Sequence, residues 1–564
     1  MTGRPGKAYA IRTVLFALAL TFAGFPAAYC AEQPGAAIAA AHPLAAAAGH
    51  EILKRGGNAF DAAVAIAAVL AVVEPYASGL GGGGLWLLHR ASDGHQVMVD
   101  ARETAPAGVK REMYLDSSGK PVRGATTQGG TAAAIPGAPA ALVHVAGNYG
   151  VLPLAETLAP AIRHARDGFP VDERYSRLAG LRQSLLRQEA EASRIFLDDG
   201  RAPREGWLLR QPELAATLER LALEGNGGFY AGPVARALVE SVKRAGGLWQ
   251  LSDLTVYRVV ERAPLRFQYR EAIITTVTLP SAGGIALAQC LQMLERFETV
   301  DPRSPRDAHL VVEALRRAFR DRAAYLGDAD FSAVPVERLA SRAYATQRAA
   351  TIDPAAATRS EAPEREPAAA GSANTTHLSV VDAAGNRVAA TLTINLLFGS
   401  GVVARGTGVL LNNEMDDFTV RADVPNAFRL RGGEANAIGP GKRPLSSMTP
   451  TFVEDSRGVL VVGAPGGSRI VSQVLLAVLD YIHAPAVDLA AIVLAPRYHH
   501  QWWPDRVEVE PDGFPAQWRA ALEAKGHRVE TGKRRWGNMQ AVFKSKRSGV
   551  AQAASDPRGA DVGN

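Results

Sequence analysis

The hydrophobic positions in the first part of the chain repeat at helical spacing. In residues 45–73 the apolar residues follow a period of 3.6, and Gly56-Gly57-Asn58 interrupts them. The spacing predicts two consecutive helices there. The same period predicts helices in four later segments: residues 154–168, 211–225, 233–245 and 305–326.

A run of glycines at residues 78–84 precedes a strand-like segment at 85–89. A nucleotide-binding loop would have this composition, but the run lacks the Gly-Lys-Ser/Thr ending of a P-loop and opens no clear βαβ unit. We therefore expect a close crossing of backbones that glycine alone permits.

The pattern changes abruptly near residue 375. Residues 353–373 are rich in Ala, Pro, Glu and Arg, which predicts a mobile, solvent-exposed linker. Period-two alternation then begins at 376–382, turns at 383–386 and resumes at 388–395, which predicts a β-hairpin. Such a boundary is a place where a chain can be cut without unfolding.

The predicted hairpin brings threonines together at one strand end. Pairing outward from the turn sets Thr393 about level with Thr376 and beside Thr375, with Thr391, Thr393 and Asn395 on one face. Strand propensity alone also favours threonine, so the cluster by itself does not define a site.

The chemistry becomes specific if the bond between Asn374 and Thr375 is cut. A threonine hydroxyl is a weak nucleophile that needs a nearby base. A freed α-amine has a pKa of about 7.7 to 8 and sits on the same residue as the hydroxyl. Thr375 would then carry nucleophile and base together, and its hydroxyl could also attack the Asn374 carbonyl to make the cut.

Composition limits the class of protein. The chain has 564 residues, of which 47% are hydrophobic and 21% charged, as expected for a large globular protein. The net charge of +6 is spread out, without a Lys/Arg run that carries interleaved aromatics, so nucleic acid is not an expected partner.

The first thirty residues have the pattern of a secretory signal peptide. Arg4, Lys7 and Arg12 precede an apolar run at 14–23, and small residues surround position 30. We expect residues 1–31 to be removed and the protein to be secreted or periplasmic; a retained anchor or a lipidated Cys30 is the alternative. No later segment is long and apolar enough to span a bilayer.

Several long motifs resemble the γ-glutamyltranspeptidase family, in the N-terminal nucleophile hydrolase superfamily, and they extend over nearly all of the chain after residue 31. The motifs are Gly56-Gly57-Asn58-Ala59-Phe60-Asp61-Ala62-Ala63, Thr375-Thr376-His377-Leu378-Ser379-Val380-Val381-Asp382, Asn412-Asn413-Glu414-Met415-Asp416-Asp417-Phe418, Arg443-Pro444-Leu445-Ser446-Ser447-Met448 and Pro465-Gly466-Gly467-Ser468-Arg469.

The resemblance implies a fold and a reaction. The fold is an α/β, four-layer αββα sandwich built jointly by a large subunit, residues 32–374, and a small subunit, residues 375–564, after cleavage between Asn374 and Thr375. Thr375 is implied as the nucleophile, oriented by Thr393, with Gly466 and Gly467 as the oxyanion hole. The substrates implied are γ-glutamyl amides such as glutathione, with water, amino acids or dipeptides as acceptors, and without cofactor or metal.

The resemblance also implies a pocket for a zwitterionic glutamyl group. Arg102, Ser446 and Ser447 match residues that hold the α-carboxylate, and the planar guanidinium suits bidentate recognition. The acceptors implied for the α-ammonium are Asn395, Glu414 and Asp417. Arg102 and Asp417 could instead form only a structural ion pair.

Some residues depart from the family pattern or suggest other roles. Phe428 replaces a tyrosine that many bacterial members place over the pocket, in a candidate lid at 424–441, which puts acceptor preference in doubt. His499-His500 lacks a chelating spacing, so we expect packing beside Trp502 and Trp503. Two other functions remain open: a cephalosporin (glutaryl) acylase on the same machinery, and an uncleaved exported binding protein.

Overall fold

Two antiparallel β-sheets form the centre of the molecule. The structure is a computed structural model that describes residue 2 and residues 30–298, 300–361 and 375–559. The six-stranded sheet has the order β2 (Ala37–Ala40), β10 (Thr376–Val381), β11 (Arg387–Thr393), β3 (Gly83–Arg90), β4 (His95–Ala101), β7 (Val260–Arg262). The seven-stranded sheet has the order β1 (Cys30–Pro34), β20 (Val550–Ser555), β19 (Gln540–Ser545), β15 (Gly458–Gly463), β14 (Thr451–Glu454), β9 (Ala272–Thr276), β8 (Leu265–Tyr269).

The two sheets pack face to face through small side chains. Ala39 and Ala389 from the first sheet and Val461 and Ala553 from the second belong to one buried cluster, with Phe452 as its largest member. Alternation along each strand sends the other side chains outward, to the helices.

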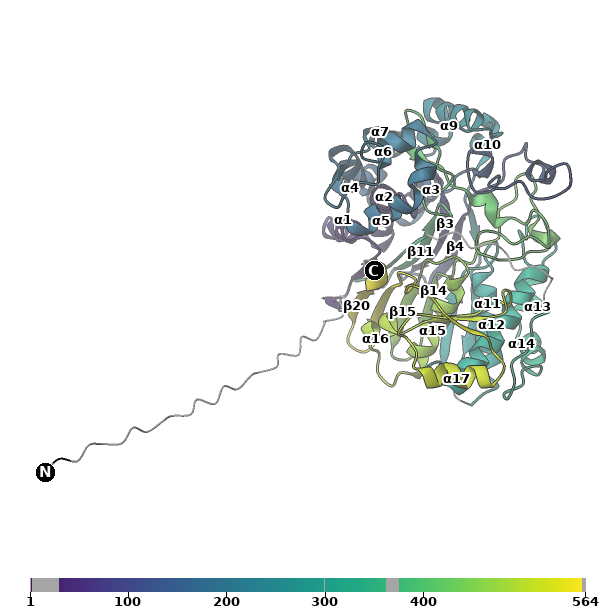
Figure 1. The fold of residues 1–564 in the computed structure, drawn as a ribbon. Helices are drawn as coiled ribbons and strands as arrows, with labels where there is room; N and C mark the ends of the chain where they lie inside the picture. Colours follow the sequence, from purple (N-terminus) through teal and green to yellow (C-terminus); the bar gives the residue numbers. More distant parts are fainter. Residues whose placement is uncertain (1, 3–29, 299, 362–374, 560–564) are drawn as a thin grey trace.

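Helices cover the outer face of each sheet (Figure 1). Over the six-stranded sheet lie α1 (Pro43–Lys54), α2 (Ala59–Val73), α3 (Ala138–Tyr149), α4 (Leu154–Asp167), α5 (Glu173–Leu186), α7 (Pro212–Glu224) and α9 (Gly232–Arg244). Over the seven-stranded sheet lie α11 (Gly283–Leu294), α12 (Pro305–Tyr325), α15 (Arg469–His483) and α17 (Ala516–Ala524). The result is the four-layer αββα sandwich, as expected, and the predicted helices are confirmed.

Helix α2 shows how the sequence fixes this packing. Every residue of α2 is buried, because the helix lies between the six-stranded sheet and the helices outside it. Asn58 and Asp61 form a capping box that satisfies the first amides, and Asp61 also accepts from the Val151 amide at 3.0 Å. The Gly-Gly-Asn break therefore becomes the start of a buried helix.

The glycine run is a close backbone crossing, as predicted. A Cβ on Gly81 would lie 2.0 Å from the Leu410 carbonyl oxygen, and one on Gly82 would lie 2.0 Å from the Thr393 carbonyl oxygen. A side chain at position 81 would push away β13 (Val409–Leu410) and one at position 82 the end of β11, so glycine is required at both.

The predicted hairpin forms, but its register differs by one residue from the prediction. Thr376 pairs with Leu392 rather than with Thr393. The reason is the turn: the Asp382 amide donates to the Asn386 carbonyl at 3.1 Å and the Gly385 amide donates to the Asp382 carbonyl at 3.1 Å, with Gly385 at a φ of 94°. The Asp382 carboxylate also accepts from the Asn386 amide at 2.9 Å and from the Ala59 amide at 3.0 Å. The turn is therefore one residue shorter than predicted, and Thr393 lies level with Thr375 instead of Thr376.

Only the start of the predicted linker is described, and it is more ordered than expected. Residues 353–361 are mostly exposed, yet the Thr358 hydroxyl donates to Glu313 at 2.6 Å and the Ser360 amide donates to Asp505 at 2.7 Å. These contacts tie the segment to α12 and to the loop at Asp505, while the predicted exposure to solvent is confirmed for this part. Residues 362–374, including Asn374, lie outside the described residues.

The N-terminal prediction is largely outside the described residues as well. β1 begins at Cys30 and pairs with β20, so the first strand includes the last two residues of the predicted signal peptide. Among the described residues, the helices are all too short or too polar to cross a membrane.

Candidate active site

Thr375 lies at the start of β10, next to the end of β11. Its Oγ1 is 3.2 Å from the Oγ1 of Thr393, and the side chain is 6% exposed. The Asn395 amide donates to Thr393 Oγ1 at 2.8 Å, which orients the Thr393 hydroxyl. The predicted pairing of Thr375 with Thr393 is therefore present despite the change of register.

Asn395 lies beyond the end of β11 and lines the same cavity as Thr375 and Thr393. β11 ends at Thr393, and Asn395 has a φ of 73°, a left-handed conformation that Asn tolerates better than most residues. Its Nδ2 donates to the Asn413 carbonyl at 2.8 Å, and the Asn413 side chain accepts from the Leu396 amide at 3.0 Å. Thr391 contacts His377 at 2.8 Å, just as Thr393 contacts Thr375, so these two threonines share one face of β11 as predicted, while Asn395 lies beyond the end of the strand.

Arg102 follows directly after β4 and is completely buried. Its guanidinium forms ion pairs with Glu414 and Asp417, and its Nη1 is 3.3 Å from a Glu103 carboxylate oxygen. Glu414 and Asp417 come from one short 3-10 helix, Glu414–Asp417. The Arg102 guanidinium thus contacts three carboxylates, and Arg322 acts on Asp417 from further away.

The three buried carboxylates at Arg102 have raised pKa values. Burial, which disfavours the charged form, raises the pKa of Glu414 and of Asp417 above their ordinary values, although Arg102 opposes the shift. Burial likewise raises the pKa of Glu103 to about 7. In the described structure, one oxygen of Glu103 and one of Glu414 have no hydrogen-bond partner. The cluster has unused capacity to accept hydrogen bonds from a cation.

The two serines lie at the same cavity. Ser446 Oγ accepts from the Met448 amide at 3.1 Å, while the buried Ser447 hydroxyl has no partner among the described groups. The free space is about 20 Å³, room for about one water molecule, so a glutamyl group requires the covering side chains to move. The cavity is lined by Arg102, Thr375, Thr393, Asn395, Glu414, Asp417, Phe428, Leu430, Leu445, Ser446, Ser447, Met448, Gly467 and Ile470.

A glycine turn between β15 and α15 closes one side of this cavity. Gly466 has a φ of 133° and Gly467 a φ of 59°, and both amides lack an acceptor within the described part of the chain. Gly467 lines the cavity and Gly466 precedes it. A Cβ on Gly467 would lie 2.7 Å from a ring carbon of Phe428, so the Phe428 ring packs directly on the turn.

Three histidines near these elements have structural contacts. His377 lies between Thr391 and Ser379, away from the cavity lining, and burial lowers its pKa to about 3. His499 contacts the Ser472 hydroxyl at 2.7 Å, and His500 contacts Asp505 at 3.2 Å. Both are buried, in agreement with the predicted packing role.

One cluster of described residues has the composition of a metal site. Ligand atoms of His309, Glu313 and His527 lie within 4.8 Å of one another. Both Glu313 oxygens already accept hydrogen bonds, including one from Arg316 at 3.1 Å and one from Arg317 at 2.6 Å. Two guanidinium groups at the carboxylate oppose cation binding, so this cluster is best explained as an ion-pair network.

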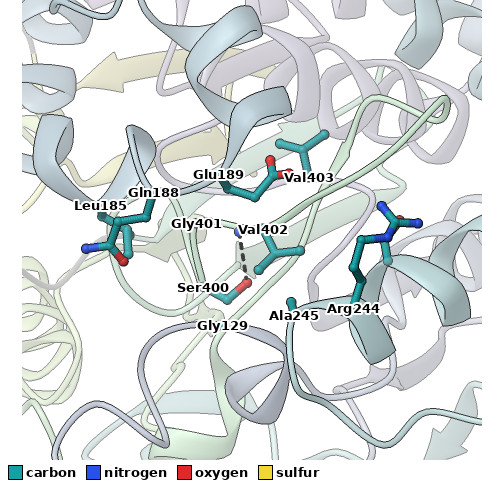
Figure 2. Close-up of a pocket in the computed structure, with 11 residues that line it drawn as sticks. Gly129, Leu185, Gln188, Glu189, Arg244, Ala245, Ser400, Gly401, Val402 and Val403 are labelled. Atoms are coloured by element: carbon teal, nitrogen blue, oxygen red, sulfur yellow. Dashed lines mark hydrogen bonds between the residues drawn. The ribbon is translucent and has the colours of Figure 1, made fainter.

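A second cavity, of about 280 Å³, lies apart from the predicted site residues (Figure 2). Ser400 Oγ, at its centre, accepts from the Val402 amide at 3.4 Å. The cavity is lined by Gly129, Leu185, Gln188, Glu189, Ser241, Arg244, Ala245, Ser400, Gly401, Val402 and Val403.

The sequence reasoning assigned no role to two residues that shape the active site. Glu103 is the third carboxylate at Arg102, and its place next to Arg102 in the chain was the available signal. Asn413 fixes Asn395 and Leu396, and its Nδ2 donates to the Thr127 carbonyl at 2.8 Å. Its position in the Asn412-Asn413-Glu414 motif was visible, but its contacts depend on the folded loop.

The fold and the site together define the class of protein. A four-layer αββα sandwich that presents a threonine at the start of a central strand is the architecture of an N-terminal nucleophile hydrolase. A solved cephalosporin acylase from Bacillus halodurans has this fold with a TM-score of 0.82 at 27% identity, covering 97% of this chain and 98% of that one.

Sequence comparison gives the family. The Gamma-glutamyltranspeptidase family matches residues 45–563, so the chain belongs to that family of enzymes. A glutathione hydrolase proenzyme of Escherichia coli is 41% identical over 518 residues, covering 91% of this chain and 88% of that protein. One of Pseudomonas aeruginosa is 41% identical over 565 residues, covering 98% of each.

Proposed function

We propose that this protein is a secreted glutathione hydrolase and γ-glutamyltransferase that cuts itself before Thr375. The observation that carries the proposal is the contact of 3.2 Å between the Thr375 and Thr393 hydroxyls, at the cavity that also contains Arg102 and its carboxylates. The two glutathione hydrolase proenzymes at 41% identity support the same activity.

In the proposed reaction, the Thr375 Oγ1 attacks the γ-carbonyl carbon of a glutamyl amide. The α-amine of Thr375 takes the hydroxyl proton and delivers it to the leaving amine, which departs and leaves a γ-glutamyl ester. Water then attacks the ester carbonyl and gives a proton to the α-amine, which passes it to Oγ1 as the acyl–Oγ1 bond breaks, so that glutamate is released and the Thr375 hydroxyl is restored. An amino acid or dipeptide in place of water gives a transferred product.

The oxyanion that forms at each attack needs hydrogen-bond donors. The amides of Gly466 and Gly467 have no acceptor among the described residues, and Gly467 lines the cavity with Gly466 directly before it, which suits them to this role. Loss of one such donor costs about 2.7 to 4 kcal/mol of transition-state stabilisation in other hydrolases.

The charge cluster suits the glutamyl end of the substrate. The α-carboxylate would pair with Arg102 and the partnerless Ser447 hydroxyl, and the α-ammonium would pair with Glu414 and Asp417. When the substrate binds, ion pairs between Arg102 and its carboxylates would thus be replaced by ion pairs between these side chains and the substrate. A glutaryl group has no ammonium, which would leave the carboxylates uncompensated.

Intact mass and N-terminal sequencing of the purified protein test the self-cleavage. Two fragments are expected, one of which begins at Thr375, and Thr375→Ala is expected to yield an uncut, inactive chain. A wild-type chain that is fully active while intact, or normal cutting of Thr375→Ala, would contradict the proposal. An uncleaved exported binding protein would give one full-length mass without activity.

Substrate choice separates the proposed enzyme from a cephalosporin acylase. We expect γ-glutamyl-p-nitroanilide to be hydrolysed at least about 100-fold faster, in kcat/KM, than glutaryl-p-nitroanilide, because one buried ion pair is lost with the latter. The reverse order would identify an acylase. Rates with and without glycylglycine measure the share of transfer.

A further inference from the structure

Gln473 lies behind the glycine turn, on the first turns of α15. It is 1% exposed, and its Nε2 donates to the Pro465 carbonyl oxygen at 2.7 Å. Because a carbonyl can only accept, this contact also fixes which end of the amide faces Pro465. Gln473 does not line the cavity and touches none of the groups assigned to substrate above.

The contact has a geometric consequence for the next residue. The bond between Pro465 and Gly466 is trans, and in a planar trans peptide the C=O and the N–H point in opposite directions. A donor that holds the Pro465 carbonyl on the α15 side therefore aims the Gly466 N–H to the opposite side of that peptide.

The turn needs such a constraint because glycine supplies little of its own. Gly466 and Gly467 have φ of 133° and 59°, values that glycine adopts freely. The Gly466 and Gly467 carbonyls accept from the Arg469 and Ile470 amides, each at 3.2 Å, whereas the Pro465 carbonyl has no backbone donor among the described residues. Gln473 is itself confined by packing: its Oε1 has no hydrogen-bond partner among the described residues, but a Cβ on Gly537 would lie 2.0 Å from that oxygen, so the loop at Gly537 packs tightly on the amide. The rigid partner of the turn is thus the glutamine.

We propose that Gln473 is a positioning residue that fixes the Pro465–Gly466 peptide so that the Gly466 amide is preorganised to donate to the oxyanion. The inference rests on the proposed function, because it assumes the acyl transfer at Thr375. Preorganised donors stabilise the transition state without reorganisation during the reaction, whereas a turn free to rotate must be ordered at each turnover. Gln473 therefore acts on the rate rather than on ground-state binding.

The first test is Gln473→Met, which keeps the length and volume of the side chain and removes the donor. Measured on material already cut into two chains, kcat/KM for γ-glutamyl-p-nitroanilide is expected to fall about 10- to 100-fold. The inhibition constant of L-glutamate, a ground-state ligand without a developing oxyanion, is expected to change less than about twofold.

Gln289→Met is the matched control. Gln289 is also a buried helical glutamine, 2% exposed, but its Nε2 donates to Asp321 at 3.2 Å, away from the glycine turn. This variant is expected to lose thermal stability comparable to that of Gln473→Met and to keep the wild-type kcat/KM. Equal kcat/KM in the two variants would overturn the inference.

Gln473→Glu supplies a readout that packing alone would not change. A protonated glutamic acid can donate to the Pro465 carbonyl, whereas the carboxylate cannot, and burial keeps the acid form into the neutral range. The ratio of variant to wild-type kcat is therefore expected to fall as the pH rises from 6 to 9, at constant circular dichroism. A ratio independent of pH would contradict the proposal.

The outcomes separate this inference from the proposed function. If wild-type protein stays uncut or does not hydrolyse γ-glutamyl-p-nitroanilide, the proposed function fails and the inference fails with it. If wild type is cut and active while Gln473→Met matches Gln289→Met, only the role of Gln473 is wrong. If Gln473→Met does not accumulate as cut protein, the pH dependence of Gln473→Glu decides.

Discussion

Two buried charge clusters in this protein contain the same kinds of groups in opposite proportions. At Arg102, one guanidinium faces three carboxylates, two of which keep an oxygen without a partner among the described residues. At Glu313, one carboxylate faces Arg316 and Arg317, and both its oxygens also accept from Thr358, at 3.2 and 2.6 Å. The Glu313 cluster is satisfied and the Arg102 cluster is not.

The acid–base properties follow the same division. Burial by itself would raise the pKa of Glu313, but the charge of Arg316 and the Thr358 and Arg317 contacts lower it below its ordinary value. At Arg102, burial prevails and the carboxylate pKa values rise. Buried polar groups left incompletely paired mark a place where a ligand completes the pairing, whereas complete pairing indicates a structural role.

The largest expected effect is on activity at the Arg102 cluster. Arg102→Met removes the only cation that contacts Glu414 and Asp417 in the described structure, and with it the proposed partner of the α-carboxylate. We expect kcat/KM for γ-glutamyl-p-nitroanilide to fall about 10²- to 10³-fold, the usual cost of a buried charge pair. A variant within about fivefold of wild type would place the carboxylate site elsewhere.

The corresponding change at the other cluster should affect stability instead. Glu313→Gln leaves Arg316 and Arg317 buried without their shared carboxylate, so the free energy of unfolding is expected to fall by about 3 kcal/mol. Urea unfolding measures this loss, and kcat/KM of the folded variant should stay within about twofold. If Glu313→Gln lost activity but kept its stability, the Glu313 cluster would have a role in catalysis or binding instead of a structural one.

Asp416, next to the Arg102 cluster, and Glu313 should contribute to the free energy of unfolding with opposite dependence on pH. Burial raises the pKa of Asp416, beside Asp417, to about 7, so its stabilising contribution is full below about pH 4 and is lost as the pH rises through 7. Glu313, with a lowered pKa, contributes above its unfolded pKa of about 4.3 and loses that contribution as the pH falls through its folded value.

The variant Asp416→Asn tests the contribution of Asp416 to the pH dependence of stability. The free energy of unfolding of wild type is expected to decline between pH 5 and pH 8, and the variant should show a smaller decline. Urea unfolding at several pH values provides the measurement. An identical slope in both proteins would show that Asp416 does not titrate in this range.

The smallest expected effect concerns one hydroxyl. Ser447→Ala removes a buried hydroxyl without a partner among the described groups, so the free energy of unfolding should change by less than about 0.5 kcal/mol. The loss of one hydrogen bond to the α-carboxylate should raise KM about 5- to 10-fold. Ser472→Ala, which removes a hydroxyl bonded to His499, is the control and should lower stability while KM stays constant.

Much of the fold and of the candidate site could be predicted from the sequence, because motifs specify residue types and their spacing. The layers, the main helices and the meeting of Thr375 with Thr393 all followed from periodicity, the turn and the family resemblance. The register did not, because the hairpin closes between Asp382 and Asn386, where the Asp382 carboxylate accepts from amides of its own turn and of α2. The amide from α2 belongs to Ala59, which lies more than three hundred residues earlier in the chain.

The sequence identified most of the site residues, but it did not show how many carboxylates are buried around Arg102. The sequence places Glu103 beside Arg102, yet only the folded chain shows that both side chains are buried together with Glu414. The role of Gln473 was equally hidden, since a glutamine in a helix carries no signal until the carbonyl it faces is known.

The strand order of the six-stranded sheet determines what a cut before Thr375 can do to the whole molecule. β10 and β11 pair with each other, β10 is also hydrogen-bonded to β2, and β11 to β3, so two strands from after the cut lie between strands from before it in one sheet. Two polypeptides joined in this way stay together without any covalent link. Synthesised apart, each would present bare strand edges to solvent and to other copies of itself.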